Sequence, residues 1–501
     1  MDLLSVGRGL LGLLGILAIA FVLSSDKRRV NWRTVVAGLA LQLVFAVFVL
    51  KGDDMAEVFG PLGWPKSAFA FVSGLFVDFL SAVEVGSSFI FGGLGLSPGV
   101  EGSLGFFFFS QVLPTVIVFA ALMSILYYLG VMQGIVRAVA FVVRRALGTS
   151  GPESLSVSAN IFVGQTEAPL VIKPYIKTLS RSELMAVMTG GMATIAGGVL
   201  ASYVAFLGER VASAEGVAIE VGQQLVAEQL LGASVMAAPA ALVLAKILIP
   251  ESPAGALASE RGTLAERAAR GEAPPRVIPN TLSPTAIAVG AVPGLVTDAG
   301  EATRPATSSD LARESTEEAI EDAGPKNVID AAATGAADGL QLALNIGAML
   351  IAFLALIAIF NGIIGWGLGL ANVTLPEGTT ALELGLGYVL APVAWLIGVP
   401  NPDLLSFGGL IGTKVIANEF VAYTQLADGI AAGALQPKTI TMATFALCGF
   451  ANLSSIGIQI GGIGPLAPER TGEIASLGLR AVLAGTLANL MTATIAGVLL
   501  G

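Results

Sequence analysis

The stretch at residues 160–174, NIFVGQTEAPLVIKP, decides how the rest of the chain is interpreted. It places Gln165, Thr166 and Glu167 inside an apolar run, between Gly164 and Pro169, where an uninterrupted helix is not expected. Within a membrane a carboxylate costs about 2.5–3.5 kcal/mol, so such a residue usually faces a cavity or a substrate. The stretch therefore predicts a broken helical hairpin that carries a binding site.

A second stretch, LIGTKVIANEFVAYTQL at 410–426, holds Asn418 and Glu419 in the same kind of setting. A glycine-rich apolar helix with polar residues in its middle follows each stretch: MTGGMATIAGGVLASYV at 188–204 and FALCGFANLSSIGIQIGG at 445–462. Two copies of a hairpin with a glutamate, each followed by a broken helix, are typical of a secondary transporter. Its substrate site lies where the two inverted repeats meet.

Composition places the chain in a membrane. It has 501 residues, of which 54% are hydrophobic and 12% charged, and its mean hydropathy is +0.82. These values are those of an integral membrane protein. The chain has no histidine, which excludes imidazole catalysis and histidine metal sites, and its single Cys448 excludes an intramolecular disulfide. A net charge of −10 argues against a nucleic-acid partner.

We expect an all-α fold of eight membrane-spanning helices with two re-entrant hairpins. The spans are predicted at 6–23, 34–50, 104–129, 183–206, 229–249, 337–366, 439–462 and 477–500. Interfacial helices are expected at 69–93, which contains Asp78 and Glu84, and at 381–399. Basic residues follow the first run, so we interpret it as a span rather than a signal peptide.

Basic residues set the predicted orientation. The strongly positive segments are expected in the cytoplasm: 27–33, 137–145 and 173–181. If the hairpins at 160–181 and 400–431 are re-entrant, both termini lie outside and the hairpins enter from opposite sides. Residues 251–326 are rich in Ala, Pro, Ser, Thr and Glu, and predict a disordered cytoplasmic linker with a short amphipathic helix at 264–273.

The first repeat also offers ligands for a hard cation. Asn160 lies four residues before Gly164, so its side-chain oxygen and a freed carbonyl such as that of Val163 can bind such an ion. Thr194, between glycines in the following helix, adds a hydroxyl. Two alternatives give these residues a structural role only. In the first, Lys173 would neutralise Glu167; in the second, the glycines would serve only helix packing.

The second repeat offers hydrogen-bonding groups for a polyhydroxylated ring. Glu419, Asn452 and Ser455 can supply them, and the spacing of the last two predicts one helix face. The neighbouring Phe450 can stack on a flat ring. A polar network between helices that serves structure alone is the alternative.

Six motifs in order resemble the concentrative nucleoside transporter family. They are GQTEAPL, ATIAG, SVMAAPAAL followed by Pro250 and Glu251, NVIDAAATGAADGLQLALNIGAML, GTKVIANEFVAY and FANLSSIGIQIGGIGPLAPER. The likeness runs from about Pro65 to the C-terminus, excepting the linker. It implies a homotrimer in which a scaffold holds a mobile transport domain that moves like an elevator. GQTEAP is similar to the sodium-coupled branch, whereas proton-coupled bacterial relatives look more like GQSENF.

The resemblance also implies a role for each site residue. Gln165, Thr166 and Glu167 would contact the nucleobase, with Val199 and Phe450 as walls. Glu419, Asn452 and Ser455 would bind the ribose. Sodium would be held by Asn160, Val163, Thr194 and Ile195, and Gly164 would leave room for purines as well as pyrimidines.

The sequence thus predicts a sodium-driven symporter in the inner cell membrane that imports nucleosides such as uridine, cytidine and adenosine, without an organic cofactor. Alternatives are proton coupling, a sodium pump subunit or channel, and a membrane enzyme with Glu167 and Glu419 as acid and base. The predicted domains are N-terminal scaffold helices (1–145), a first transport repeat (146–250), the linker (251–326), a scaffold helix with an interfacial helix (327–398) and a second transport repeat (399–501).

Overall fold

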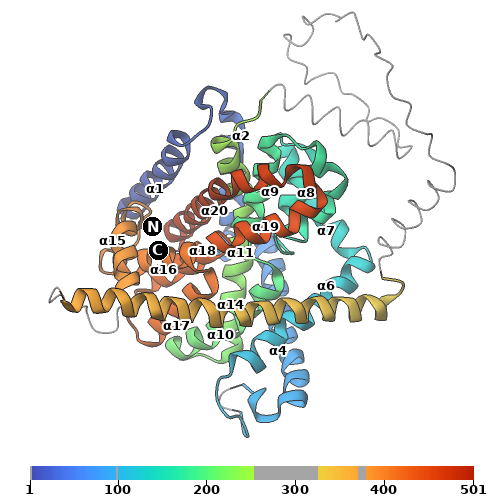
Figure 1. The fold of residues 1–501 in the computed structure, drawn as a ribbon, viewed down its shortest axis with the longest axis vertical. Helices are drawn as coiled ribbons and strands as arrows, with labels where there is room; N and C mark the ends of the chain where they lie inside the picture. Colours follow the sequence, from blue (N-terminus) through green and yellow to red (C-terminus); the bar gives the residue numbers. More distant parts are fainter. Residues whose placement is uncertain (1–2, 98–99, 253–324, 371–379, 501) are drawn as a thin grey trace, which may run out of the picture.

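The computed structural model describes residues 3–97, 100–252, 325–370 and 380–500, and every regular element in these ranges is helical. One helix, α14 (Val328–Leu370), lies across the whole bundle (Figure 1). The predicted linker at 251–326 falls almost entirely outside the described residues, and so does the amphipathic helix predicted at 264–273.

The N-terminal part contributes three long helices, α1 (Leu3–Val22), α2 (Trp32–Leu50) and α4 (Trp64–Phe91). Short elements connect them and lead to the next long helix: η1 (Lys27–Arg29), α3 (Gly52–Val58), η2 (Gly60–Gly63), η3 (Gly92–Leu94) and α5 (Phe108–Gln111). Asn31 starts α2, because its Oδ1 accepts hydrogen bonds from the N–H groups of Arg33 and Thr34.

Helix α6 (Leu113–Tyr128) packs along α14, and α7 (Val131–Leu147) precedes the first hairpin. With 43 residues, α14 is about 64 Å long at 1.5 Å per residue. Beyond its contact with α6, α14 exposes large apolar side chains such as Ile351 and Trp366. An apolar exposed surface on a long helix is suited to lipid or to another apolar protein surface.

The first hairpin consists of α8 (Gly151–Ala159) and η4 (Ala168–Thr178). A capping box of Ser150 and Glu153 begins α8. Helix α8 ends at Ala159 with Asn160 as its C-cap, and the chain turns before entering η4, which is kinked at Ile172. The predicted interruption between residues 164 and 169 is therefore confirmed.

The helix after this hairpin is also interrupted, as predicted. It consists of α9 (Arg181–Ala193) and α10 (Gly197–Glu215), and Thr194 between them is extended with φ −117° and ψ 168°. The next helix, α11 (Ile219–Leu248), starts ten residues before the predicted start at residue 229. That boundary was wrong because Gly222 packs closely on α10, where an added Cβ would lie 2.3 Å from the Gly208 carbonyl oxygen.

The second half repeats this plan of a hairpin followed by an interrupted helix. Its elements are α15 (Ala381–Leu396), η7 (Asn401–Asp403), α16 (Leu404–Ile416), α17 (Glu419–Ala431), α18 (Pro437–Leu447), α19 (Leu453–Ile463), η8 (Gly464–Leu466), η9 (Pro468–Arg470) and α20 (Thr471–Leu499). Gly449, between α18 and α19, has φ +154°. A side chain rarely adopts this value, which explains a glycine in the interruption.

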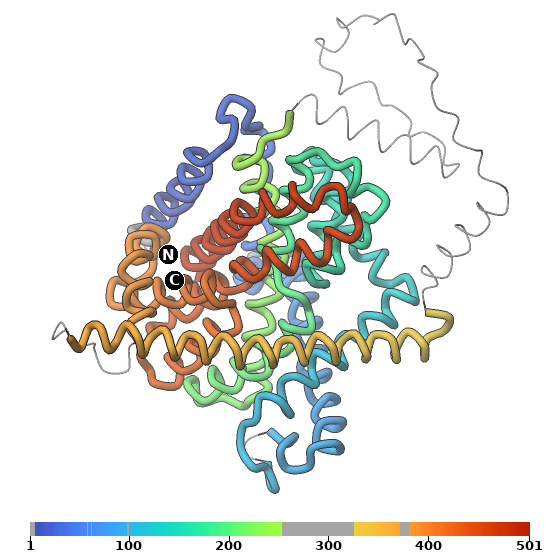
Figure 2. The backbone as a smooth tube through the Cα atoms, in the orientation of Figure 1, coloured from blue at the N-terminus to red at the C-terminus, as the bar shows by residue number. Residues whose placement is uncertain are grey.

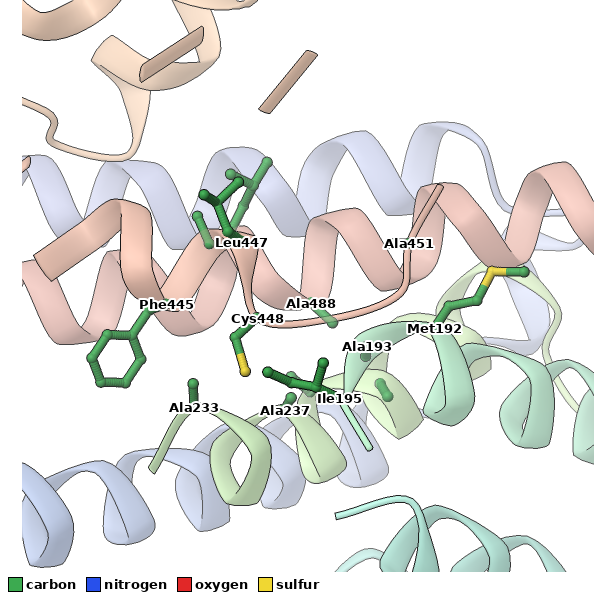
Figure 3. Packing of buried hydrophobic residues seen from close by; sticks show 14 of the residues in the cluster. Met192, Ala193, Ile195, Ala233, Ala237, Phe445, Leu447, Cys448, Ala451 and Ala488 are labelled. Atoms are coloured by element: carbon green, nitrogen blue, oxygen red, sulfur yellow. The ribbon is translucent and has the colours of Figure 1, made fainter. Parts of the chain in front are cut away.

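The two interruptions meet in the core. The Phe450 N–H donates to the Thr194 carbonyl at 3.3 Å, so the non-helical segments contact each other directly. Figure 3 shows Ile195 and Cys448 there, with Ala233 and Ala237 of α11 nearby. Backbone of this kind is tolerated at membrane depth only where protein buries it or where it lines a cavity.

The two chain ends lie close together. Helices α1 and α20 pack antiparallel, because Gly9 lies against Val498 and Gly12 lies against Thr494. The N and C labels in Figure 2 are accordingly adjacent. Both ends of the described chain thus lie on the same side of the bundle.

Seven described helices are long and apolar enough to cross a membrane, which establishes a multi-pass membrane protein but differs from the predicted eight spans. The seven count α9 and α10 together as one span and omit 6–23 and 439–462, the latter divided into α18 and α19. They include α4, which continues without a break through Asp78 and Glu84, whereas the sequence predicts an interfacial helix there.

Candidate functional site

A cavity of about 460 Å³ lies where the two hairpins, the two interrupted helices and α14 meet. All nine residues predicted to bind substrate line it: Gly164, Gln165, Thr166, Glu167, Val199, Glu419, Phe450, Asn452 and Ser455. Ligand sites in proteins commonly have volumes of roughly 300–1,000 Å³, so the cavity can hold a small organic molecule.

Glu419 is the buried carboxylate of the cavity, with 5% of its surface exposed. It occupies the first position of α17, which Asn418 starts by accepting the N–H of Val421 at 2.9 Å. Its Oε1 accepts the Tyr203 hydroxyl at 3.1 Å, and its Oε2 accepts Nδ2 of Asn452 at 2.9 Å. The carboxylate is therefore fixed from two sides while it still lines the cavity.

Asn452 starts α19 rather than lying within it. Its Oδ1 accepts the N–H of Ser455 at 2.8 Å and the hydroxyl of Ser454 at 2.8 Å. The spacing predicts that Asn452 and Ser455 share one helix face, and in the structure Asn452 is the N-cap of α19 while Ser455 lies in its first turn. Both residues line the cavity, and the capping bond turns Nδ2 of Asn452 towards Glu419.

In the first hairpin, the Glu167 side chain closes the turn by binding the backbone of Gly164. Its Oε2 accepts the N–H of Gly164 at 2.8 Å. The alternative in which Lys173 neutralises Glu167 is not observed, because the structure assigns Glu167 no ion pair within the described chain and Lys173 is exposed. This carboxylate therefore remains available at the cavity.

Gln165 links the two halves of the protein. Its Nε2 donates to the Ser455 hydroxyl at 3.1 Å, and its Oε1 accepts Nε2 of Gln459 at 3.2 Å. Gln459 also donates to the Met188 carbonyl at 2.9 Å, so the link reaches α9. Gln459 and Tyr203 are site residues that the sequence does not predict, although each lies one helical turn after a predicted residue, Ser455 and Val199 respectively.

The remaining cavity wall is mostly apolar. Val199 and Phe450 lie on it as predicted, and α14 adds Leu342, Ile346 and Met349. The cavity therefore combines carboxylates and amides from the hairpins and α19 with apolar side chains from α10, α14 and Phe450. Such an arrangement suits a guest with several hydroxyl groups and a flat ring.

The predicted cation ligands lie in two segments that contact each other. The Gly197 N–H donates to the Phe162 carbonyl at 3.1 Å, which holds the turn after α8 against the interruption at 194–196. Asn160, Val163, Thr194 and Ile195 are all buried in these segments. The structure thus brings the two predicted pairs of ligands into one region.

Asn160 has an unused oxygen there. It is fully buried, and its Nδ2 donates to the Ser156 carbonyl at 3.1 Å, whereas Oδ1 accepts no hydrogen bond from any described residue. The Thr194 hydroxyl donates to the Gly190 carbonyl at 2.9 Å, which leaves its oxygen lone pairs able to accept. No group of three or more His, Cys, Asp or Glu suited to a metal occurs among the described residues.

Family models match most of the chain. Residues 11–94 match the Na+ dependent nucleoside transporter N-terminus, residues 109–210 match a nucleoside recognition model, and residues 229–497 match the Na+ dependent nucleoside transporter C-terminus. Together the three matches include every predicted site residue.

Curated relatives extend over nearly the whole chain. An uncharacterised transporter, YutK of Bacillus subtilis, is 42% identical over 98% of both chains. The nucleoside permease NupC of Helicobacter pylori is 36% identical over 98% of this chain and 97% of its own. Sodium/nucleoside cotransporter 1 of the mouse is 34% identical over 97% of this chain and 63% of its own. These relatives are transporters rather than enzymes.

Solved structures agree with the fold. CNTnw in an inward-facing substrate-bound state aligns with a TM-score of 0.75 and 38% identity over 99% of this chain and 98% of that one. A CNTnw variant in an outward-facing state aligns with a TM-score of 0.75 and 36% identity over 99% and 98% of the two chains. With its fold, its cavity and its sequence in agreement, the chain belongs to the concentrative nucleoside transporter family.

Proposed function

We propose that this protein is a symporter that imports nucleosides into the cell and uses the sodium gradient as its driving force. The observation that carries the proposal is that nine predicted substrate residues from both halves line one cavity, close to a buried Asn160 oxygen without a hydrogen-bond donor. The family model and the mouse relative, both described as sodium-dependent transporters of nucleosides, support sodium as the ion.

The ribose would lie at Glu419, Asn452 and Ser455. A carboxylate has two acceptor oxygens, so Glu419 can accept two hydroxyl protons, while Asn452 and Ser455 can donate to ribose oxygens. Hydrogen bonds to a charged group contribute about 1.5–3 kcal/mol each. The existing bonds from Tyr203 and Asn452 hold Glu419 in one orientation, which reduces the entropy cost of binding.

The nucleobase would lie against the first hairpin. Gln165, Thr166 and Glu167 offer donors and acceptors to the ring edge, and Phe450 and Val199 offer apolar surface to the ring faces. Gly164 adds no side chain to this part of the cavity. We therefore expect purine nucleosides such as adenosine to be carried as well as uridine and cytidine.

Sodium would be held by Asn160 Oδ1, the Thr194 hydroxyl oxygen and the carbonyls of Val163 and Ile195. Neutral oxygens are suitable ligands for a hard monovalent cation. Bound sodium would fix the turn of the first hairpin against the interruption between α9 and α10. The same turn carries Gln165, so the ion would prepare the base site.

Sodium can supply the driving force for accumulation. One sodium ion that moves down 100 mV contributes about 2.3 kcal/mol, which corresponds to roughly 40-fold accumulation of substrate before any sodium gradient is added. This is sufficient for scavenging dilute nucleosides.

In the membrane, the hairpins α8–η4 and α16–α17 would be re-entrant, and the two halves would form an inverted repeat. The transport domain, which contains both hairpins and both interrupted helices, would move like an elevator against a scaffold that includes α14. Inward-facing and outward-facing states described for CNTnw support this alternation. The exposed apolar side chains of α14 suit a homotrimer in the inner membrane.

The test is uptake of radiolabelled uridine, cytidine and adenosine into proteoliposomes that contain the purified protein. We expect accumulation with an inward sodium gradient and none when choline replaces sodium. Uptake that ignores sodium but follows an inward proton gradient would favour proton coupling. Sodium flux without any nucleoside would indicate a channel.

A further inference from the structure

Lys414 places an ammonium group in the core without a carboxylate partner among the described residues. It lies in the last turn of α16 and is completely buried, and its Nζ donates to the Ala446 carbonyl at 2.9 Å and to Oδ1 of Asn489 at 2.7 Å. Within the described chain it forms no ion pair with a carboxylate. Burying an ammonium group without a carboxylate partner is costly, so stability alone does not explain the lysine.

Asn489 connects Lys414 to both interrupted helices. From α20, its Nδ2 donates to the Ala193 carbonyl at 2.7 Å and to the Cys448 carbonyl at 2.6 Å. Ala193 ends α9 and Cys448 follows the end of α18. One buried amide therefore holds carbonyls at the ends of two helices that belong to different halves of the protein. Figure 3 shows Ala193 and Cys448 close to each other.

The Asn489 contacts lie next to residues of both proposed sites, the sodium site and the nucleoside site. Ala193 directly precedes Thr194 and Ile195, which are proposed to hold sodium. Cys448 is two residues before Phe450, which lines the nucleoside cavity. A displacement of either interruption therefore changes the hydrogen bonds of Asn489 and acts on the other interruption.

The two halves differ in the polar side chain near the end of the first helix of each hairpin. In the first half it is Asn160, whose Oδ1 lacks a donor. In the second half the last turn of α16 brings the Lys414 ammonium to the C-terminal end of α18. Carbonyls at the end of a helix carry a partial negative charge, which a cation stabilises. The second interruption thus has a lysine Nζ beside it, whereas the first has an open oxygen.

We propose that Lys414 and Asn489 couple sodium binding to nucleoside binding. The inference rests on the proposed sodium-driven function. Lys414 keeps the second interruption and Asn489 in a fixed geometry, so that sodium at the first interruption changes the position of the Phe450–Asn452 segment through the Asn489 amide. Both are positioning residues, because neither contacts the substrate.

The test measures the uridine dissociation constant of the purified full chain in nanodiscs, in sodium chloride and in choline chloride. The ratio of the two constants is the coupling factor. Asn489→Asp keeps the partner of Lys414 and the size of the side chain, but it presents an oxygen in place of the amide donor to the two carbonyls. Thr494→Val is the matched control, because Thr494 is buried on the same helix and donates only to the Leu490 carbonyl.

Coupling between two ligands is typically about 5–150-fold, and we expect the wild type and Thr494→Val to fall in this range. In Asn489→Asp we expect the factor to fall to about 1–2, while the uridine constant without sodium stays within about threefold of the wild type. Lys414→Met should have the same effect, because Asn489 loses the ammonium that orients it.

A double variant, Lys414→Met with Asn489→Leu, separates coupling from stability. It removes the buried charge and its partner together, so the melting temperature should recover relative to Lys414→Met alone. Coupling should remain lost. Recovery of coupling together with stability would overturn the proposal and leave a purely structural role.

Two further results have different meanings. A coupling factor in Asn489→Asp equal to that of the wild type would overturn the coupling role and leave the symporter proposal intact. If the uridine affinity of the wild type were the same with and without sodium, this result would refute the sodium-driven function and the coupling proposal with it.

Discussion

Glu419 and Asn452 are held in place before a substrate arrives. The Tyr203 hydroxyl and the Asn452 amide fix both carboxylate oxygens, and the start of α19 fixes the amide. Each bond satisfies a buried polar group that would otherwise destabilise the fold. The same contacts that stabilise the empty cavity therefore also orient the groups proposed to bind ribose.

Replacing Glu419 by glutamine should weaken uridine binding by roughly 10–150-fold, because an amide offers one acceptor oxygen where the carboxylate offers two and it carries no charge. Uptake rates at low uridine concentration in proteoliposomes measure this loss. Glu383→Gln is the control, since Glu383 also lies in the first turn of a helix but does not line the cavity. Wild-type affinity in Glu419→Gln would contradict the ribose assignment.

Asn160→Ala should raise the sodium concentration that gives half-maximal uptake by at least about tenfold, because one oxygen ligand is lost. Uridine affinity at saturating sodium should change little. Thr189→Val serves as control, since Thr189 is buried in α9 and its hydroxyl donates to the Met185 carbonyl. An unchanged sodium dependence in Asn160→Ala would remove Asn160 from the ion site.

The sequence predicts most of the cavity because polar residues in an apolar run carry a strong signal. Gln165, Glu167, Glu419 and Asn452 stand out for this reason, and all line one cavity. Tyr203 and its contact with Glu419 could not be predicted, because a tyrosine on an apolar helix is ordinary and its partner lies 216 positions away.

At the level of elements, glycine and proline mark the interruptions correctly, but they do not fix helix ends. The break at Thr194 is where the sequence places it, and the break at Gly449 lies in the second glycine-rich helix, which the sequence predicts to be broken without giving the position. The start of α11 differs from its predicted position, because the acidic and glutamine residues after Ile219 form helix as readily as loop. Close packing on Gly222 decides between the two.

Gly449→Ala should destabilise the protein by about 1–3 kcal/mol, because a side chain is strained at φ +154°. An added Cβ would also lie 2.6 Å from Oδ1 of Asn489. Thermal unfolding followed by intrinsic fluorescence measures the effect as a lower melting temperature. Gly461→Ala, in α19 with open space around its Cα, should leave the melting temperature unchanged or slightly raised. Equal effects of the two substitutions would refute the strain at Gly449.

For the whole molecule, the two halves share one plan and meet at one cavity. Each half contributes a hairpin and an interrupted helix, and the interruptions contact each other through Thr194 and Phe450. This arrangement follows from the two glutamate-bearing stretches in the sequence. The number of membrane crossings does not follow from the sequence, because length and apolarity alone cannot place α1, α4 and the divided α18–α19 relative to a bilayer.

Both termini should lie outside the cell, because the antiparallel α1 and α20 bring them together and the basic loop at 27–33 favours the cytoplasm. Tags at either end should react with a membrane-impermeant reagent on intact cells. A tag inserted in the 27–33 loop should react only after the membrane is opened. A cytoplasmic C-terminus with an external N-terminus would mean that one hairpin crosses the membrane.

The most direct test is an experimental structure of the protein with uridine and sodium. We predict the ribose hydroxyls within hydrogen-bond distance of Glu419, the base between Gln165 and Phe450, and a sodium ion bound by Asn160 and Thr194. Uridine bound outside this cavity, or a bound ion that contacts neither Asn160 nor Thr194, would contradict the proposed site.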